Sequence, residues 1–219
     1  MQHKDYKDIA IYGAGGLGRE VACLLRLINE AAPTWNLIGF FDDGKHVGDG
    51  VGSFGPVLGG LAEVNQWPEE LAVVLCFGCP STLARIAPSI TNPRISFPNI
   101  ISPDFSIADK ETFVIGHGNI ITGSCLVTTN VTIGNFNLLN GSVVFGHDVR
   151  TADYNVFMPG VRISGEVTIG NRCIFGAGCF VKQQLAIPDG VTLSPLSPLL
   201  TRPKAESLYM GNPARRIKL

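Results

Sequence analysis

Four histidines could carry protons, because the ordinary pKa of an imidazole, about 6.5, lies close to neutral pH. They are His3, His46, His117 and His147. His147 is the strongest candidate for a general base, and Asp148 follows it directly in the sequence. A base of this kind could accept the proton of an attacking hydroxyl or amine. The alternative interpretation is a surface histidine in a turn, beside a solvated aspartate.

A glycine-rich segment at residues 13–18, Gly-Ala-Gly-Gly-Leu-Gly, matches G-x-G-x-x-G between an expected strand and an expected helix. Glycines at these positions let the backbone approach a phosphate group, which the helix N-terminus favours electrostatically. A tight turn without any ligand is one alternative. Binding of a dinucleotide such as NAD is another, but a domain of about 90 residues is too short for both halves of that fold.

The cysteines point to no metal chemistry. Cys76 and Cys79 have C-x-x-C spacing, but no second pair or nearby histidine completes a zinc site. We therefore interpret them as buried or incidental thiols and expect no metal site.

Strand and helix signals alternate in the first part of the chain. Three apolar runs predict strands, at 9–12, 37–41 and 71–77. Apolar residues at helical spacing beyond Arg19 predict one helix, and Ser81 is expected to cap another. This order predicts a small α/β domain with a parallel sheet at residues 1–94.

The sequence beyond residue 95 has a period of six. Fourteen of the fifteen residues at steps of six from Ile115 to Leu199 are apolar, whereas the chain average of 45% predicts about seven. Neither the 3.6-residue period of a helix nor the alternation of a flat strand selects one residue in six. Such repeats predict a parallel β-helix, here at residues 95–200, followed by a basic C-terminal tail at 201–219.

Three hexads would form one triangular coil of 18 residues, so residues 18 apart should stack about 4.8 Å apart. Stacking predicts two files of side chains: Asn119, Asn137 and Asn155 with Cys173 above them, and Phe157 on Phe175. His147 falls at a turn, where a side chain can face solvent or a groove between subunits. Gly165 should stack on His147, and its missing side chain is expected to leave room for a bound acyl group.

Composition excludes several classes of protein. A hydrophobic content of 45% excludes a disordered chain, and 17 basic against 18 acidic residues give no field that favours nucleic acid. No apolar stretch approaches the ~18 residues of a membrane span, and the polar start MQHKDYKD does not read as a signal peptide. We therefore expect a cytoplasmic protein with reduced thiols that binds neither nucleic acid nor membranes.

Over essentially all 219 residues, the sequence resembles the hexapeptide-repeat acyltransferases, and more specifically the PglD/NeuD-type sugar acetyltransferases. The motifs that carry the resemblance are GAGGLGRE at 13–20, FDD at 41–43, GHD at 146–148, PGVRISGEVTIG at 159–170 and GNPARRI at 211–217. The resemblance implies a small Rossmann-like N-terminal domain followed by a left-handed parallel β-helix. It also implies a homotrimer that holds acetyl-CoA in grooves between neighbouring β-helices.

The resemblance also implies roles for individual residues. His147 would be the general base, and Asp148 the carboxylate that raises its basicity. The nucleotide-sugar site would comprise the glycine loop, two acids that touch the base or ribose, and a glycine beside them: Gly13, Gly15, Gly16, Leu17, Asp42, Asp43 and Gly78. The cofactor positions would include Ala177, Gly165 and Val156, the last in place of a histidine near the thioester, with Pro195 in place of a cofactor-contacting glycine.

The function that the resemblance implies is acetyl-CoA-dependent N- or O-acetylation of a sugar, most specifically a nucleotide-linked amino sugar, by direct transfer. Two alternatives stay open: a β-helix scaffold without catalytic activity, and a regulatory module that binds nucleotide but not CoA. The basic tail is either a solvated terminus or a contact for a phosphate of CoA. The acceptor sugar and its nucleotide are not determined by the sequence.

Overall fold

The computed structural model describes residues 6–218, which form two compact units. The first unit ends at Pro103 and the second begins at Asp104. The boundary expected after residue 94 therefore lies inside the first unit, ahead of the short strands β5 (Ile95–Ser96) and β6 (Ile100–Ile101).

The first unit is built on a parallel five-stranded sheet in the order β3-β2-β1-β4-β5. Its four other strands are β1 (Lys7–Tyr12), β2 (Trp35–Phe41), β3 (Val57–Gly59) and β4 (Leu71–Leu75). Its helices are α1 (Gly16–Ala31), α2 (Leu61–Gln66), α3 (Pro80–Ile86) and a short 3-10 turn at Ala87–Ser89. The predicted α/β domain is thus confirmed, whereas β3, α2 and β5 were not predicted.

Apolar residues of β1 and α1 form the core of this unit. Ile9 and Ile11 of the central strand are fully buried, as are Val21 and its neighbours on the inner stripe of α1. The prediction that Ser81 caps the later helix is wrong by two residues: α3 begins at Pro80, and Cys79 is its N-cap. Proline suits the first helical position, because its fixed φ is helical and no N–H is lost from the hydrogen-bond ladder.

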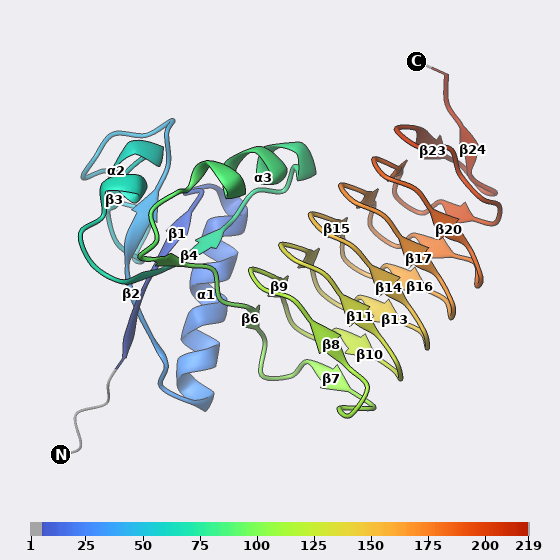
Figure 1. Ribbon diagram of the computed structural model, residues 1–219, viewed down its shortest axis with the longest axis horizontal. Coiled ribbons are helices and arrows are strands. Elements are labelled where there is room, and N and C mark those ends of the chain that lie inside the picture. Colours follow the sequence, from blue (N-terminus) through green and yellow to red (C-terminus); the bar gives the residue numbers. More distant parts are fainter. Residues whose placement is uncertain (1–5, 219) are drawn as a thin grey trace. The chain divides into compact units, whose positions relative to one another are not determined.

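The second unit is a parallel β-helix made of two-residue strands in three sheets (Figure 1). One sheet holds β7 (Ser106–Ile107), β10 (Leu126–Val127), β13 (Val144–Phe145), β16 (Arg162–Ile163), β19 (Phe180–Val181) and β22 (Pro198–Leu199). The next holds β8 (Val114–Ile115), β11 (Thr132–Ile133), β14 (Arg150–Thr151), β17 (Thr168–Ile169) and β20 (Ala186–Ile187). In the third lie β9 (Ile120–Ile121), β12 (Leu138–Leu139), β15 (Val156–Phe157), β18 (Ile174–Phe175), β21 (Thr192–Leu193), β23 (Leu208–Met210) and β24 (Arg215–Arg216).

The predicted register of 18 residues is confirmed from β8 to β22, whereas the offset is 20 residues between β7 and β10 and 16 between β21 and β23. Leu138 pairs with Val156, and Val156 with Ile174, in parallel strands. The rings of Phe157 and Phe175 stack inside the coil with centroids 4.9 Å apart and planes 1° from parallel. The second residue of each short strand points inward, which explains the period of six in the apolar residues.

The predicted file of amides also forms. The backbone N–H of Asn137 donates to Oδ1 of Asn119 at 2.8 Å, and that of Asn155 donates to Oδ1 of Asn137 at 2.9 Å. The file ends where the backbone N–H of Cys173 donates to Oδ1 of Asn155 at 2.8 Å. Each side-chain oxygen thus satisfies a backbone donor of the next coil inside a buried core, where an unpaired donor would be costly.

Left-handed backbone conformations recur at every sixth residue from Gly118 to Leu196 and turn the chain at each corner. Most of these positions are not glycine; Asn130 and Asp148 are examples, with φ of +53° and +60°. The glycines that directly follow inward residues have a different cause. A Cβ on Gly134 would lie 2.6 Å from the carbonyl oxygen of Ala152 in the next coil, so the coils can approach only where that atom is absent.

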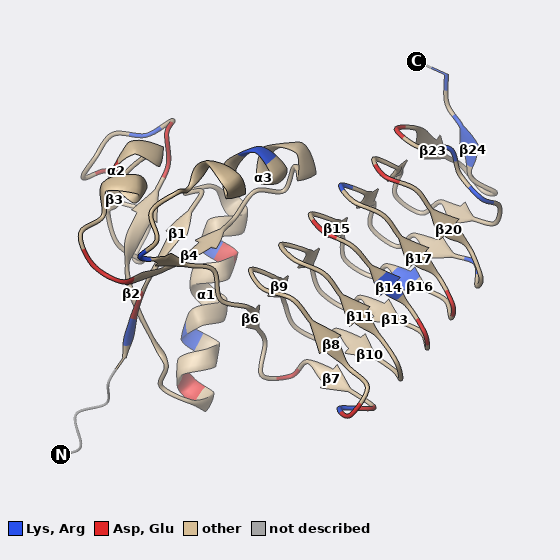
Figure 2. Cartoon of the chain, viewed as in Figure 1, with Lys and Arg blue, Asp and Glu red and all other residues tan. Residues whose placement is uncertain are grey.

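The segment that the sequence predicts as a tail continues the third sheet. Strand β23 pairs in parallel with β21, and β24 folds back antiparallel on β23. Figure 2 shows that charged residues of the β-helix lie mostly at its turns and that basic residues gather on β24.

Candidate active site

His147 lies at a corner of the β-helix, two residues after the inward Phe145 of β13. Its side chain is 53% exposed and that of Asp148 is 45% exposed, so both can meet a ligand. Nδ1 of His147 lies 2.8 Å from Oδ2 of Asp148. Because an ionised carboxylate only accepts hydrogen bonds, Nδ1 carries the proton and Nε2 keeps a lone pair.

The backbone of Asp148 explains how two adjacent residues can bond. In a flat strand, successive side chains point to opposite faces, which would keep the imidazole and the carboxylate apart. Asp148 instead has a φ of +60°, and this left-handed corner turns its side chain back toward His147. The sequence predicts that His147 falls at a turn, and the structure places the pair at such a corner.

The second oxygen of Asp148 has a partner that the sequence analysis missed. Nδ2 of Asn130 donates to Oδ1 of Asp148 at 2.5 Å. The hydrogen bonds from His147 and Asn130 lower the pKa of Asp148 below its usual range, because both stabilise the charged form. The signal available in the sequence was the spacing: Asn130 precedes Asp148 by one coil of 18 residues.

Gly165 stacks on His147 as predicted, but the expected empty space is not there. A Cβ built on Gly165 would lie 2.4 Å from Nε2 and 2.5 Å from Cε1 of His147. The imidazole itself fills the space that the missing side chain leaves, so the expectation of room for an acyl group at that point is wrong. The glycine instead allows the ring to lie close against the next coil.

In the first unit, the glycine loop connects β1 to α1. Gly13 has a φ of +111°, and a Cβ there would lie 2.6 Å from the carbonyl oxygen of Cys76. Gly15 is the N-cap of α1, and both Gly15 and Gly16 face open space, while Leu17 is half-buried. An open turn at a helix N-terminus can accept an anionic group.

Asp42 and Asp43 follow β2 and are already engaged within the protein. Oδ2 of Asp42 accepts from the backbone N–H of Ala14 at 2.8 Å, which joins the glycine loop to the end of β2. Asp43 accepts from the Tyr12 hydroxyl at 2.5 Å and from the backbone N–H of Leu61 at 2.9 Å. Burial and the Asp43 carboxylate raise the pKa of Tyr12, so its hydroxyl stays protonated and donates.

Gly78 lies beyond the end of β4, where a Cβ would meet nothing within 4 Å.

The two cysteines of the C-x-x-C pair differ in burial: Cys76 is buried and Cys79 is exposed. The Ser81 hydroxyl and then the Thr82 backbone lower the pKa of Cys79 to about 7. Among residues 6–218, no group of three or more His, Cys, Asp or Glu side chains could hold a metal ion.

Of the expected cofactor residues, Gly165 lies at the His147 corner, whereas Ala177 and Pro195 lie at a different part of the β-helix. Ala177 follows β18 and Pro195 follows β21, both in the third sheet, whereas His147 follows β13 in the first sheet. Within one chain the structure therefore does not bring these positions to the His147 corner. Val156 of β15 is 1% exposed, so its side chain offers no surface to a ligand.

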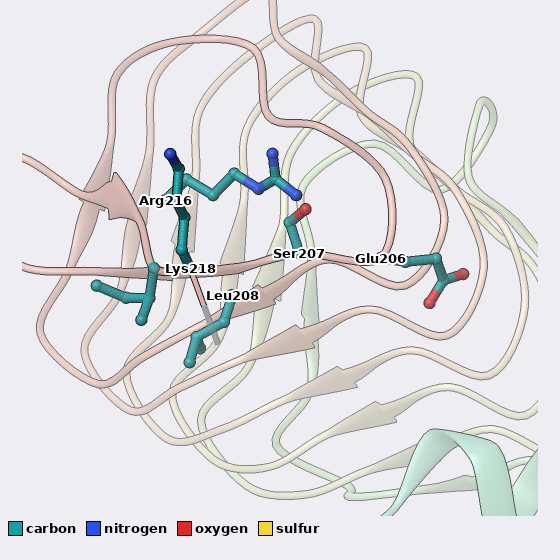
Figure 3. A pocket seen from close by; sticks show the side chains of 6 residues that line it. Glu206, Ser207, Leu208, Arg216 and Lys218 are labelled. Atoms are coloured by element: carbon teal, nitrogen blue, oxygen red, sulfur yellow. The ribbon is translucent and has the colours of Figure 1, made fainter.

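A pocket of about 440 Å³ lies at the C-terminal end of the second unit (Figure 3). Its lining includes two cations, Arg216 and Lys218, with Ser207, Leu208, Ile217 and Glu206. The sequence marks this segment as basic, but only the structure shows that two of its cations share a pocket.

Most of the first unit matches a known protein family. Residues 8–90 match the PglD N-terminal domain family. No curated protein matches the chain in sequence. In the described part of the chain, no helix combines the length and apolar character needed to cross a membrane.

Solved structures match both units together. The acetyltransferase domain of PglB from Neisseria gonorrhoeae is 22% identical, with a TM-score of 0.87 over 96% of this chain and 100% of that one. PerB from Caulobacter crescentus, solved with CoA and GDP-perosamine, is 19% identical, with a TM-score of 0.86 over 96% and 97%. WeeI from Acinetobacter baumannii is 25% identical, with a TM-score of 0.85 over 96% and 100%. The chain thus has the two-part fold of sugar acetyltransferases, as the sequence motifs predict.

Proposed function

We propose that this protein transfers an acetyl group from acetyl-CoA to an amino or hydroxyl group of a sugar, with His147 as the general base. The main observation in support is the bond between Nδ1 of His147 and Asp148, which leaves Nε2 of this half-exposed side chain as a proton acceptor. The similar PglB domain has been solved with acetyl-CoA, and PerB with CoA and a nucleotide sugar. These complexes support the same classes of substrate for this chain.

In the proposed reaction the acceptor attacks the thioester carbonyl, the new C–N or C–O bond forms, and the C–S bond breaks. Nε2 of His147 takes the proton that the acceptor loses and returns it to the departing thiolate, so no acyl-enzyme forms. Asp148 stabilises the imidazolium that exists between these two proton transfers. A well-placed base of this kind contributes about 10²–10⁴-fold to the rate.

We propose that the first unit holds the acceptor through its nucleotide. The sites would be Gly13, Gly15, Gly16, Leu17, Asp42, Asp43 and Gly78, which follow the strands β1, β2 and β4. Ligands of parallel α/β sheets bind beyond the carboxyl ends of the strands, where these residues lie. The open glycine turn would meet the diphosphate, and Asp42 would accept a hydrogen bond from a ribose hydroxyl.

We propose that acetyl-CoA binds between subunits of a homotrimer. The support is geometric: His147 and Gly165 lie at one corner of the β-helix, and Ala177 with Pro195 follows the third sheet. A neighbouring copy could place its His147 corner against these positions, which a single chain cannot do. Arg216 and Lys218 would suit a phosphate of CoA in their pocket, because both carry fixed positive charge.

The decisive experiment measures free thiol released from acetyl-CoA by the purified protein, over a panel of 3-amino and 4-amino sugars linked to UDP, GDP and dTDP. Thiol release that depends on one acceptor is the expected result. His147→Ala should lower kcat/KM by about 10²–10⁴-fold.

His117 provides a matched control. It occupies the equivalent hexad position at another corner, two residues after the inward Ile115, and its ring packs edge-on against Phe136 with centroids 5.0 Å apart. His117→Ala should keep wild-type kcat/KM. Full activity in His147→Ala would overturn the assignment of the base.

A further inference from the structure

A corner file of polar side chains runs beside His147 at intervals of 18 residues. Its members are Thr112, Asn130, Asp148, Glu166 and Gln184. The last four all have left-handed backbones, with φ between +53° and +63°. Asp148 of this file bonds to the proposed base, and Asn130 in the preceding coil bonds to Asp148.

We infer that Asn130 is a positioning residue, whose amide fixes the Asp148 carboxylate so that His147 is held in the Nδ1–H tautomer. The inference rests on the proposed role of His147 as a base. Its first test, however, reads the imidazole directly and needs no reaction.

The geometry gives Asp148 two anchors, one for each oxygen. Oδ2 faces Nδ1 of His147 at 2.8 Å, and Oδ1 accepts from Nδ2 of Asn130 at 2.5 Å. With a side chain that is 45% exposed, the carboxylate has little packing to fix its rotamer. The hydrogen bond from Asn130 therefore fixes the orientation of the Asp148 carboxylate, which bonds to solvent would not do.

A hydrogen bond to the preceding coil holds Asn130 in place. Its backbone N–H donates to Oγ1 of Thr112 at 2.7 Å, and that hydroxyl donates to Oδ2 of Asp109 at 2.7 Å. Thr129 donates to the same carboxylate oxygen at 2.7 Å. Hydrogen bonds to Thr129 and Thr112 also lower the pKa of Asp109, so it stays charged as the fixed end of this chain of bonds.

The identity of the donor atom is determined by charge. An ionised carboxylate accepts only, so the amide of Asn130 must present Nδ2 rather than Oδ1 to Asp148. An aspartate at residue 130 would have nearly the same size and tolerate the left-handed backbone, but it could not donate. This difference separates a positioning role from a requirement for shape or backbone conformation.

Gln184 offers a matched control on the same file. Its Nε2 donates to the two oxygens of Glu166 at 3.2 and 3.3 Å, and its φ is +63°. Gln184→Gly removes an amide–carboxylate contact at the same corner, with the same backbone conformation, from a carboxylate that holds no histidine in the described contacts.

The test uses the full chain labelled with ¹⁵N-histidine, and the His147 signals are assigned with His147→Gln. We expect the wild type and Gln184→Gly to show the Nδ1–H tautomer of His147 at neutral pH. Asn130→Gly and Asn130→Asp should show a measurable population of the Nε2–H tautomer. Glycine keeps the left-handed corner, and a thermal melt of each variant checks that the fold is intact.

A second readout is the rate of transfer with the best acceptor. Both Asn130 variants should lower kcat by about 10-fold, as loss of an outer partner of a functional histidine does, with KM for both substrates within about twofold of wild type. Wild-type tautomer or wild-type kcat in both Asn130 variants would overturn the inference. A tautomer change in a protein that transfers no acetyl group would refute the proposed function and leave the positioning of His147 standing.

Discussion

At the scale of single residues, the proposed site depends on the backbone at position 148. His147 and Asp148 are adjacent, and only the left-handed φ of Asp148 lets their side chains meet. Non-glycine residues adopt this region infrequently, but aspartate and asparagine tolerate it best. The local geometry thus favours a short acid after the histidine, which also serves as the partner of the ring.

Gly165 gives a direct test of the position of the imidazole. Gly165→Ala would place a Cβ 2.4 Å from Nε2 of His147, so the ring must move. We expect kcat of acetyl transfer to fall about 100-fold, because a displacement of about 1 Å can cost that much. Steady-state thiol release measures the effect.

Gly123→Ala is the control for this change. Gly123 also precedes a left-handed corner residue, Ser124, but its Cβ would meet only the Asp104 carboxylate, at 3.3 Å. Its kcat should stay within about twofold of wild type. Equal activity of the two variants would show that the ring position does not limit the reaction.

At the scale of the element, hydrogen bonds between coils stabilise the β-helix. Two-residue strands give each coil few backbone bonds per sheet, and side chains of the asparagine file add buried ones. A second file runs along the outside, where Asp153, Asn171 and Asp189 accept from the backbone of the preceding coil. The two files differ in burial and should differ in energy.

Removal of the central amide of the buried file should be costly. Asn137→Ala leaves the buried backbone N–H of Asn155 without its acceptor. We expect a loss of about 2–3 kcal/mol in the free energy of unfolding, measured by urea denaturation. Asn135 begins the half-exposed outer file and accepts from the backbone N–H of His117, so Asn135→Ala should cost less than about 1 kcal/mol, since water can replace its amide. Similar losses at both positions would contradict the role given to burial.

Asp189 of the outer file predicts that the stability of the folded protein depends on pH. The backbone N–H and side chain of Asn171, with the charge of Arg172, lower the pKa of Asp189 below its usual range. A lowered pKa in the folded state means that the stabilisation is present above about pH 4 and is lost as the pH falls through the folded-state value. Asp189→Asn keeps an acceptor for Asn171 but does not titrate. Its Tm should therefore fall less than that of the wild type between pH 6 and pH 3, and equal falls would count against this bond.

At the scale of the whole molecule, the proposed site requires more than one chain. His147 and Gly165 follow the first sheet of the β-helix, whereas Ala177 and Pro195, also expected near the cofactor, follow the third. Apolar side chains such as Phe180 and Val114 are also exposed on the single chain, at 42% and 57%. Both observations favour association of identical copies.

Sedimentation equilibrium tests this association. We expect a mass close to three times 23.4 kDa at micromolar concentration. Acetyl-CoA should stabilise that assembly, because a ligand held between subunits binds only the associated state. A monomer that binds acetyl-CoA and retains full transfer activity would exclude the proposed arrangement.

Thermal shifts separate the proposed enzyme from its two rivals. Each ligand at 100 times its Kd should add about 2.7 kcal/mol to the stability of the state that it binds. An acetyltransferase should show a raised Tm with acetyl-CoA and with one nucleotide sugar. A scaffold would respond to neither, and a nucleotide-binding regulator would respond to the nucleotide alone.

The amino-acid sequence by itself determined the repeat, and with it most of the fold. One apolar residue in six, kept from Ile115 to Leu199, admits a triangular coil and fixes which residues stack 18 apart. The asparagine file and the Phe157–Phe175 pair could therefore be predicted, because a parallel stack with constant register turns sequence distance directly into spatial contact. The same register placed His147 at a turn, which is where its pairing with Asp148 forms.

Only the tertiary structure decided the backbone conformation and the side-chain contacts of the residues at the corners. The left-handed positions carry asparagine, aspartate, serine and larger residues, so no single residue type marks them in the sequence. The contact of Asn130 with Asp148 and the packing of His147 on Gly165 depend on side-chain rotamers and on the close approach of successive coils. Periodicity specifies which residues are neighbours, whereas the direction of each exposed side chain depends on the backbone torsions and contacts that folding creates.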